Sequence, residues 1–237
     1  TALLIKKTGN NYSKDILNEP SRVKNYTTNF KKAINLGIYG ADLVYVTMYD
    51  QTPDAISYLT AIKYIADDLG VSSIFDLKLV ERFERNIGNQ DSLLALVSDA
   101  YKASDHYLKN NQQNDIGGLI IAGGWIEGLY FASNAVKTTN NEDLEKIIAE
   151  QKSTVYNLIK LLTPYSTKSQ FYKLVADLME LNELYENVAF NYTYIKPTVD
   201  EANKTTTINS TTTNKISEDQ LSAITEKIMK MRIDIIS

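Results

Sequence analysis

Apolar residues recur at intervals of three and four along almost the whole chain, which is the spacing of one face of an α-helix. The clearest stripe lies near the end of the chain, after a capping-box pattern formed by Ser217 and Gln220. That stripe consists of Leu221, Ile224, Ile228, Met231 and Ile235. The pattern predicts an all-α protein, a bundle of about eight helices in one domain spanning residues 1–237.

Prolines, glycines and polar runs divide this pattern into separate helices. Pro20 opens the first long one, and Thr52, followed by Pro53, reads as the N-cap of the second. The predicted ranges are 22–50, 52–69, 73–83, 89–108, 115–137, 141–162, 168–189 and 217–235.

The segment 191–215 breaks the helical pattern. It is rich in threonine, contains Pro197, and alternates between residue types in places. Threonine and tyrosine favour strands, and the stretch from Asp200 to Lys204 suits a turn. The sequence therefore predicts a projecting two-stranded hairpin before the last helix. A disordered loop is the alternative, because an isolated hairpin is marginally stable in water.

Seven of the ten glycines fall inside two predicted helices, 22–50 and 115–137. A glycine costs about 1 kcal/mol relative to alanine in a helix interior, so these positions need a reason. Small residues recur every fourth position in both helices: Ala33, Gly37 and Ala41 in the first, Gly124, Gly128 and Ala132 in the second. Such a row forms a shallow groove that allows close approach. We expect the two helices to contact one another at the centre of the fold.

The same two helices also resemble each other. Residues 37–39 and 43–45 can be set against 123–125 and 129–131 without a gap. One interpretation is an internal duplication of residues 20–110 and 113–237, each with about four helices. The other is that small and aromatic residues recur by chance in core helices.

Charge and composition narrow the classes of function. The net charge is −4 and the pI is near 5.2, with four arginines in all, which argues against a nucleic-acid binder. The chain has no cysteine, which excludes thiol catalysis, disulfides and thiolate-bound zinc. His106 is the single histidine, so a di-iron site with paired Glu-x-x-His motifs cannot be built. We expect no cofactor and no metal.

The run from Ile116 to Ile126 holds eleven apolar or glycine residues without a break. A membrane span needs about 20 apolar residues, and shorter runs are more typical of buried core helices. Glu127 follows directly and strengthens that interpretation. The sequence therefore predicts a core helix and no transmembrane helix.

Asp42 and Glu127 are the two carboxylates that stand within apolar, glycine-bearing helix centres. A charge there must be paired or hydrogen-bonded. If the two helices cross at their small-residue rows, both carboxylates approach one pocket with Tyr39 and Trp125, and with Tyr45 and Tyr130 nearby. Tyr39, Asp42, Trp125 and Glu127 are accordingly the candidate ligand-binding residues. The structural alternative is that each carboxylate faces solvent or bonds to a tyrosine hydroxyl.

The segments 36–43 (LGIYGADL) and 124–130 (GWIEGLY) resemble a group of uncharacterised helical lipoproteins of Bacteroidota. The resemblance spans residues 1–190 and carries no established activity. It implies an exported protein, periplasmic or lipid-anchored to the envelope through a cysteine upstream of Thr1.

These observations lead to two hypotheses for function. The first is a non-enzymatic, extracytoplasmic helical protein that binds a protein partner or a small ligand. The alternative is an enzyme or small-molecule sensor that uses Asp42 and Glu127 in a pocket lined by tyrosine and tryptophan. A tetratricopeptide-like scaffold is disfavoured, because the helices are long and the 34-residue period is absent.

Overall fold

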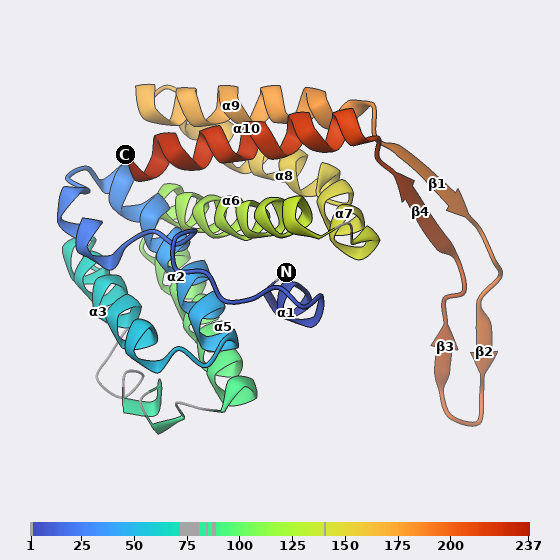
Figure 1. Ribbon diagram of the computed structural model, residues 1–237, viewed down its shortest axis with the longest axis horizontal. Coiled ribbons are helices and arrows are strands. Elements are labelled where there is room, and N and C mark those ends of the chain that lie inside the picture. Colours follow the sequence, from blue (N-terminus) through green and yellow to red (C-terminus); the bar gives the residue numbers. More distant parts are fainter. Residues whose placement is uncertain (1, 72–80, 84, 87–88, 140) are drawn as a thin grey trace.

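Helices make up most of the computed structural model, which describes residues 2–71, 81–83, 85–86, 89–139 and 141–237 (Figure 1). The predicted fold class is confirmed in outline: a helical bundle with a small hairpin before the last helix. The elements are α1 (Ala2–Lys7), η1 (Pro20–Asn25), α2 (Asn29–Met48), α3 (Thr52–Asp68), α5 (Gln90–Asn110), α6 (Asn114–Thr138), α7 (Glu142–Ala149), α8 (Lys152–Leu162), η3 (Thr163–Tyr165), α9 (Ser169–Glu186), β1 (Ala189–Thr193), β2 (Thr198–Asp200), β3 (Thr205–Thr207), β4 (Thr211–Lys215) and α10 (Glu218–Ile236).

The two glycine-bearing helices, α2 and α6, cross in direct contact at the centre of the bundle (Figure 1). A Cβ atom placed on Gly37 would lie 2.0 Å from the carbonyl oxygen of Ile120. One placed on Gly123 would lie 1.9 Å from the carbonyl oxygen of Ile34. The predicted contact is therefore confirmed, and glycine is required there because backbone meets backbone.

The contact differs in one detail from the predicted rows of small residues. Gly37 takes its predicted place, but its partners are Ile120 and Gly124, and the second close approach falls on Gly123. Gly128, which the second row included, has open space where a Cβ would lie. Farther along the crossing large side chains lie between the two helices, such as the rings of Tyr45 and Phe131 with centroids 4.8 Å apart, so no glycine is needed there.

The crossing is reciprocal. Ile34 meets Gly123, and Ile120 meets Gly37. The offset that aligns Gly37 with Gly123 also aligns Ile34 with Ile120. A duplicated unit would produce this symmetry, although the duplication of 20–110 and 113–237 stays a prediction.

Three predicted helix boundaries are wrong. The helix expected over 168–189 ends at Glu186, and Ala189 already belongs to β1. The helix expected over 22–50 begins at Asn29, because Pro20 opens only the short η1 and Thr28 caps α2 by accepting a hydrogen bond from the Lys31 amide (3.2 Å). The helix expected over 141–162 is divided into α7 and α8. At the junction the Gln151 amide donates to Ile148, three residues back, at 3.2 Å, so the α-helical register is interrupted.

Two further predictions concern 73–83 and α6. Most of the helix predicted over 73–83 lies outside the described residues, and 81–83 are helical.

By length and composition α6 is apolar enough to cross a membrane, yet 61% of its most apolar window is buried inside the fold. It contacts α2, α5, α7, α8 and α10, as the core helix expected from the sequence should. The described residues therefore contain no clear transmembrane span.

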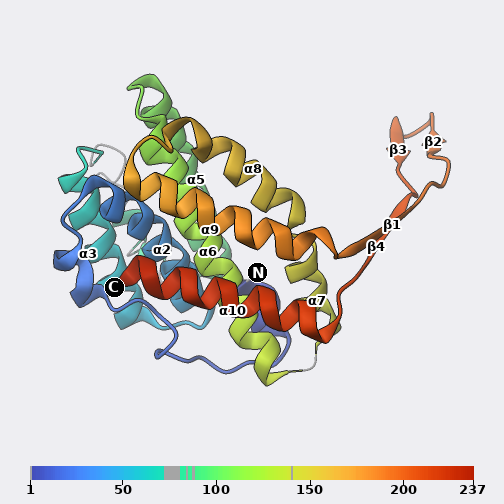
Figure 2. The ribbon, with the colours of Figure 1, turned by 90° about the horizontal axis from the view of Figure 1, so that it is seen from above.

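A narrow β-ribbon leaves the helical body between α9 and α10 (Figures 1 and 2). At its base β1 pairs antiparallel with β4, with Phe190 opposite Asn214, and at its tip β2 pairs with β3. The turn falls where it was predicted: the Asp200 carboxylate accepts a hydrogen bond from the Asn203 amide (3.0 Å), and Lys204 has a positive φ of 51°. The hairpin predicted over 191–215 is confirmed, with strands that span 189–215.

Candidate functional site

The crossing of α2 and α6 brings Asp42 and Glu127 together in the protein interior. Both side chains are fully buried, with 0% exposure, and their carboxyl groups lie within hydrogen-bonding reach of each other. A third charged residue, Arg232 of α10, joins them and is 5% exposed. We refer to Asp42, Glu127 and Arg232 as the carboxylate cluster.

Arg232 contacts three separate groups. Its Nε donates to Glu127 Oε2 at 3.0 Å and its Nη2 to Glu127 Oε1 at 2.9 Å, a bidentate pair. Nη2 also donates to the carbonyl oxygen of Ile16 at 3.0 Å. The guanidinium carbon lies 4.5 Å from the ring centroid of Tyr130. The cluster therefore ties α6, α10 and the segment before η1 together.

Asp42 carries the unusual protonation state of the cluster. Its Oδ2 accepts from the Asn18 amide at 3.3 Å, while Oδ1 is buried and has no donor when the group is ionised. Burial, followed by the neighbouring Glu127 carboxylate, holds the pKa of Asp42 well above its usual range. Burial raises the pKa of Glu127 as well, but Arg232 opposes that rise. We infer that Asp42 is a neutral acid that donates to the Glu127 carboxylate, whose charge Arg232 balances.

A buried amide and tyrosine network closes one side of the cluster. The Asn18 side-chain amide donates to Tyr26 Oη at 2.9 Å and to Asn35 Oδ1 at 3.2 Å, and Asn35 in turn donates to the Lys31 carbonyl at 2.9 Å. Asn18 and Asn35 are both fully buried. Each polar group here is matched to a partner within the protein, which is the behaviour of a structural network.

The aromatic residues expected around the carboxylates have other partners. Tyr39 lies beside Asp42, but its hydroxyl donates to the Glu19 carbonyl at 3.0 Å. Trp125 Nε1 donates to Gln151 Oε1 at 2.9 Å, away from the cluster. Of the four candidate residues, Asp42 and Glu127 meet, Tyr39 flanks them, and Trp125 lies apart.

Two pockets of the described part of the chain lie away from the carboxylates. One lies between α2, α3, α5 and α6, and the other between α9, α10 and the start of α2; neither is lined by Asp42 or Glu127. The groups that would do acid–base chemistry are engaged with Arg232 and Asn18. The geometry therefore favours the structural interpretation of this pair.

Sequence reasoning missed Arg232 as the third member of the cluster. A signal was present, because Arg232 follows Ile228 by four residues and so lies on the apolar stripe of α10. A charged residue on a buried stripe needs a buried partner. The two isolated core carboxylates were the available partners.

Replacing Asp42 by asparagine is expected to stabilise the protein at neutral pH. Above about pH 4, the ordinary pKa of an aspartate, Asp42 loses its proton in the unfolded chain but keeps it in the folded protein. Because its folded pKa is raised, wild-type stability falls with rising pH, by about 1.4 kcal/mol per unit, up to that folded pKa. The asparagine amide donates to Glu127 without needing a proton. Urea unfolding between pH 4 and 8 measures the free energy of unfolding of both proteins.

The expected result is a flatter pH profile for Asp42→Asn, with the two proteins converging near pH 4. Asp54→Asn provides the matched control, because the Asp54 carboxylate is paired with Lys14 at 2.5 Å and its pKa is lowered, so its removal should destabilise. An Asp42→Asn protein that keeps the wild-type slope would rule out a buried proton on this residue.

The β-ribbon is the second feature that stands out. Phe190, Tyr192 and Tyr194 occupy alternate positions, so Phe190 and Tyr192 of β1 share one face. Their exposed fractions are 39%, 66% and 68%. We call these three residues the aromatic stripe. An exposed row of this kind is typical of an interaction surface.

The base of the ribbon is fixed to the helical body. Lys152 of α8 lies 5.8 Å from the centroid of the Phe190 ring, and the Asn214 side chain donates to the Lys146 carbonyl at 3.4 Å. Farther out, the Ile195 amide donates to Ser210 Oγ at 3.1 Å, bridging the gap between the two small sheets. The first two contacts attach the base of the ribbon to α8 and α7.

Comparison with known proteins finds no matching family model, no matching curated protein and no matching solved structure.

Proposed function

We propose that this chain is a non-enzymatic, extracytoplasmic binding protein that recognises a protein partner through its β-ribbon. The observation that carries the proposal is the aromatic stripe, which stands exposed on an arm that extends away from the helical body (Figure 2). Tyrosine and phenylalanine supply large contact areas with few rotatable bonds, and they are enriched at the centres of interfaces.

The composition of the ribbon suits a protein partner better than a nucleic acid or an acidic surface. Its charged residues nearly balance: Lys196, Asp200, Glu201, Lys204 and Lys215. No arginine lies in the segment, so a bidentate phosphate contact is not supplied there. Each two-stranded sheet also has free edges, to which an extended segment of a partner can add by β-augmentation.

The helical body serves as the scaffold in this proposal. The carboxylate cluster ties α2, α6 and α10 together, and the ribbon joins α9 to the start of α10. A rigid base gives the arm a fixed direction, which lowers the entropy lost on binding. Extracytoplasmic location rests on the resemblance to helical lipoproteins and is part of the proposal.

The proposal is tested by site-specific photo-crosslinking. A benzophenone side chain is placed at Tyr192 on the ribbon, or at Tyr172 on α9, in the full chain expressed in intact cells of its source. The two tyrosines have matching exposures, 66% and 67%. We expect a discrete protein adduct from Tyr192 and none of the same mass from Tyr172. An adduct from Tyr172 alone would place the interface on the helical body and refute recognition by the ribbon.

A further inference from the structure

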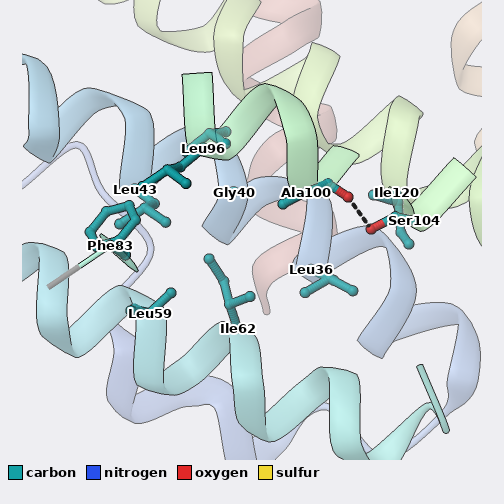
Figure 3. Close-up of a pocket in the computed structure, with 11 residues that line it drawn as sticks. Leu36, Gly40, Leu43, Leu59, Ile62, Phe83, Leu96, Ala100, Ser104 and Ile120 are labelled. Carbon is teal, nitrogen blue, oxygen red and sulfur yellow. Dashed lines mark hydrogen bonds between the residues drawn. The ribbon is translucent and has the colours of Figure 1, made fainter. Parts of the chain in front are cut away.

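An apolar pocket lies beside α2, where Leu36, Gly40 and Leu43 line it (Figure 3). Its walls come from α2, α3, α5 and α6, with Phe83 closing one end. The cavity volume is about 50 Å³. Protein interiors are close-packed, and voids larger than a water molecule are few. A cavity bounded by four helices therefore stands out in this fold.

The side chains that line the pocket are almost entirely apolar. Ser104 contributes the only polar side chain among the lining residues, and its hydroxyl donates to the Ala100 carbonyl at 2.7 Å (Figure 3). The Ser104 oxygen can still accept one hydrogen bond, but a polar group placed here would lose its other hydrogen bonds to water without replacement. The occupant must therefore be apolar where it touches the pocket.

Within the described residues, the pocket is reached from the side of α5. Most lining residues are buried, Ile62 and Phe83 to 3% exposure, whereas Val97 and Ala100 on α5 are half-buried. A molecule can thus insert an apolar end beside α5 and leave a polar head in solvent. A dry apolar cavity of about 150 Å³ holds one benzene molecule, so the smaller space here fits a chain end rather than a ring.

We propose that this pocket binds the end of an unbranched aliphatic chain, such as that of a fatty alcohol, a fatty acid or a lipid. The side chains that would report on it are Ile62 of α3 and Ile120 of α6, which both line the pocket, from two different helices. This site is separate from the ribbon, so its test is independent of the protein partner.

The test titrates the full chain, carrying 13C-labelled isoleucine methyl groups, with n-alcohols from butanol to decanol. Saturable shifts of the Ile62 and Ile120 methyl signals are expected. Affinity should rise about fourfold for each added methylene, until the cavity is filled. The exposed Ile56 methyl should not move, because it lies outside the pocket.

Ala100→Leu fills the cavity from the half-buried side, and Ala103→Leu makes the same change at an exposed position of α5. The first variant should weaken decanol binding at least tenfold, and the second should bind like wild type. Equal affinity of both variants, or no saturable shift in wild type, would overturn the proposal. Phosphatidylcholine vesicles then distinguish the source: the same shifts assign a lipid acyl chain, and their absence, with decanol still bound, assigns a free chain.

Discussion

Gly123→Ala is expected to destabilise the protein by more than about 3 kcal/mol, a large share of the stability of an ordinary domain. The added Cβ would lie 1.9 Å from the Ile34 carbonyl oxygen, so the backbones of α2 and α6 must separate. No side-chain rotation relieves this clash, because the obstructing atom belongs to the main chain. Gly37→Ala should destabilise the protein by a similar amount, because its Cβ would lie 2.0 Å from the Ile120 carbonyl oxygen.

The control for this prediction lies in the same helix. Gly128 has open space where a Cβ would lie, so Gly128→Ala should gain up to about 1 kcal/mol from helix propensity. Urea unfolding followed by circular dichroism compares the three variants with wild type. If Gly123→Ala and Gly128→Ala gave the same stability, the close crossing of α2 and α6 would be wrong.

Breaking the buried ion pair is expected to have the second large effect. Glu127→Gln leaves Arg232 without its bidentate partner, and Arg232→Met leaves two buried carboxyl groups facing each other. Removal of one member of a buried pair typically costs about 3–5 kcal/mol. The loss in Arg232→Met should grow with pH, because both carboxyl groups must then stay protonated in the folded state.

The double variant Glu127→Leu with Arg232→Met separates charge from packing. Replacement of a whole buried ion pair by apolar residues is often close to neutral, so this variant should recover most of the loss. The exposed pair of Lys173 and Asp234, 2.8 Å apart, offers a contrast, since its removal should cost less than about 1 kcal/mol. Single variants at Glu127 or Arg232 with wild-type stability at pH 8 would contradict the structural role of the cluster.

The centre of the fold could be predicted from the sequence because its signal is local. Gly37 lies in a helix interior at a cost in propensity, and only a close approach repays that cost. The register of the crossing could not be read in the same way. It depends on how the two helices are oriented against each other, which helix spacing alone does not determine, and Gly123 rather than Gly128 lies at the contact.

The meeting of the two carboxylates could be predicted by the same reasoning, but the residues that surround them could not. Asp42 and Glu127 were expected together because each stands in an apolar helix that carries a row of small residues. Arg232 comes from a helix more than a hundred residues farther along the chain, and no spacing rule connects it to Glu127. Asn18 lies in a segment without regular structure, where periodicity gives no guidance.

The remaining errors fall at boundaries and in side-chain partners. Pro20 can open either a 3-10 turn or an α-helix, and the capping bond of Thr28 decided between them. Trp125 was placed near the carboxylates by its neighbour Glu127. Positions two residues apart on a helix, such as 125 and 127, point about 200° apart, and Trp125 accordingly turns toward Gln151.

Recognition of a protein partner through the ribbon is the central claim, and one binding measurement tests it most directly. The protein crosslinked at Tyr192 is purified, and its affinity is measured for wild type, for Tyr192→Ser with Tyr194→Ser, and for Tyr172→Ser. All three tyrosines are at least 66% exposed, so none of the changes should alter stability. The account predicts a loss of affinity of at least tenfold for the ribbon variant and wild-type affinity for Tyr172→Ser. Wild-type affinity of the ribbon variant would contradict it.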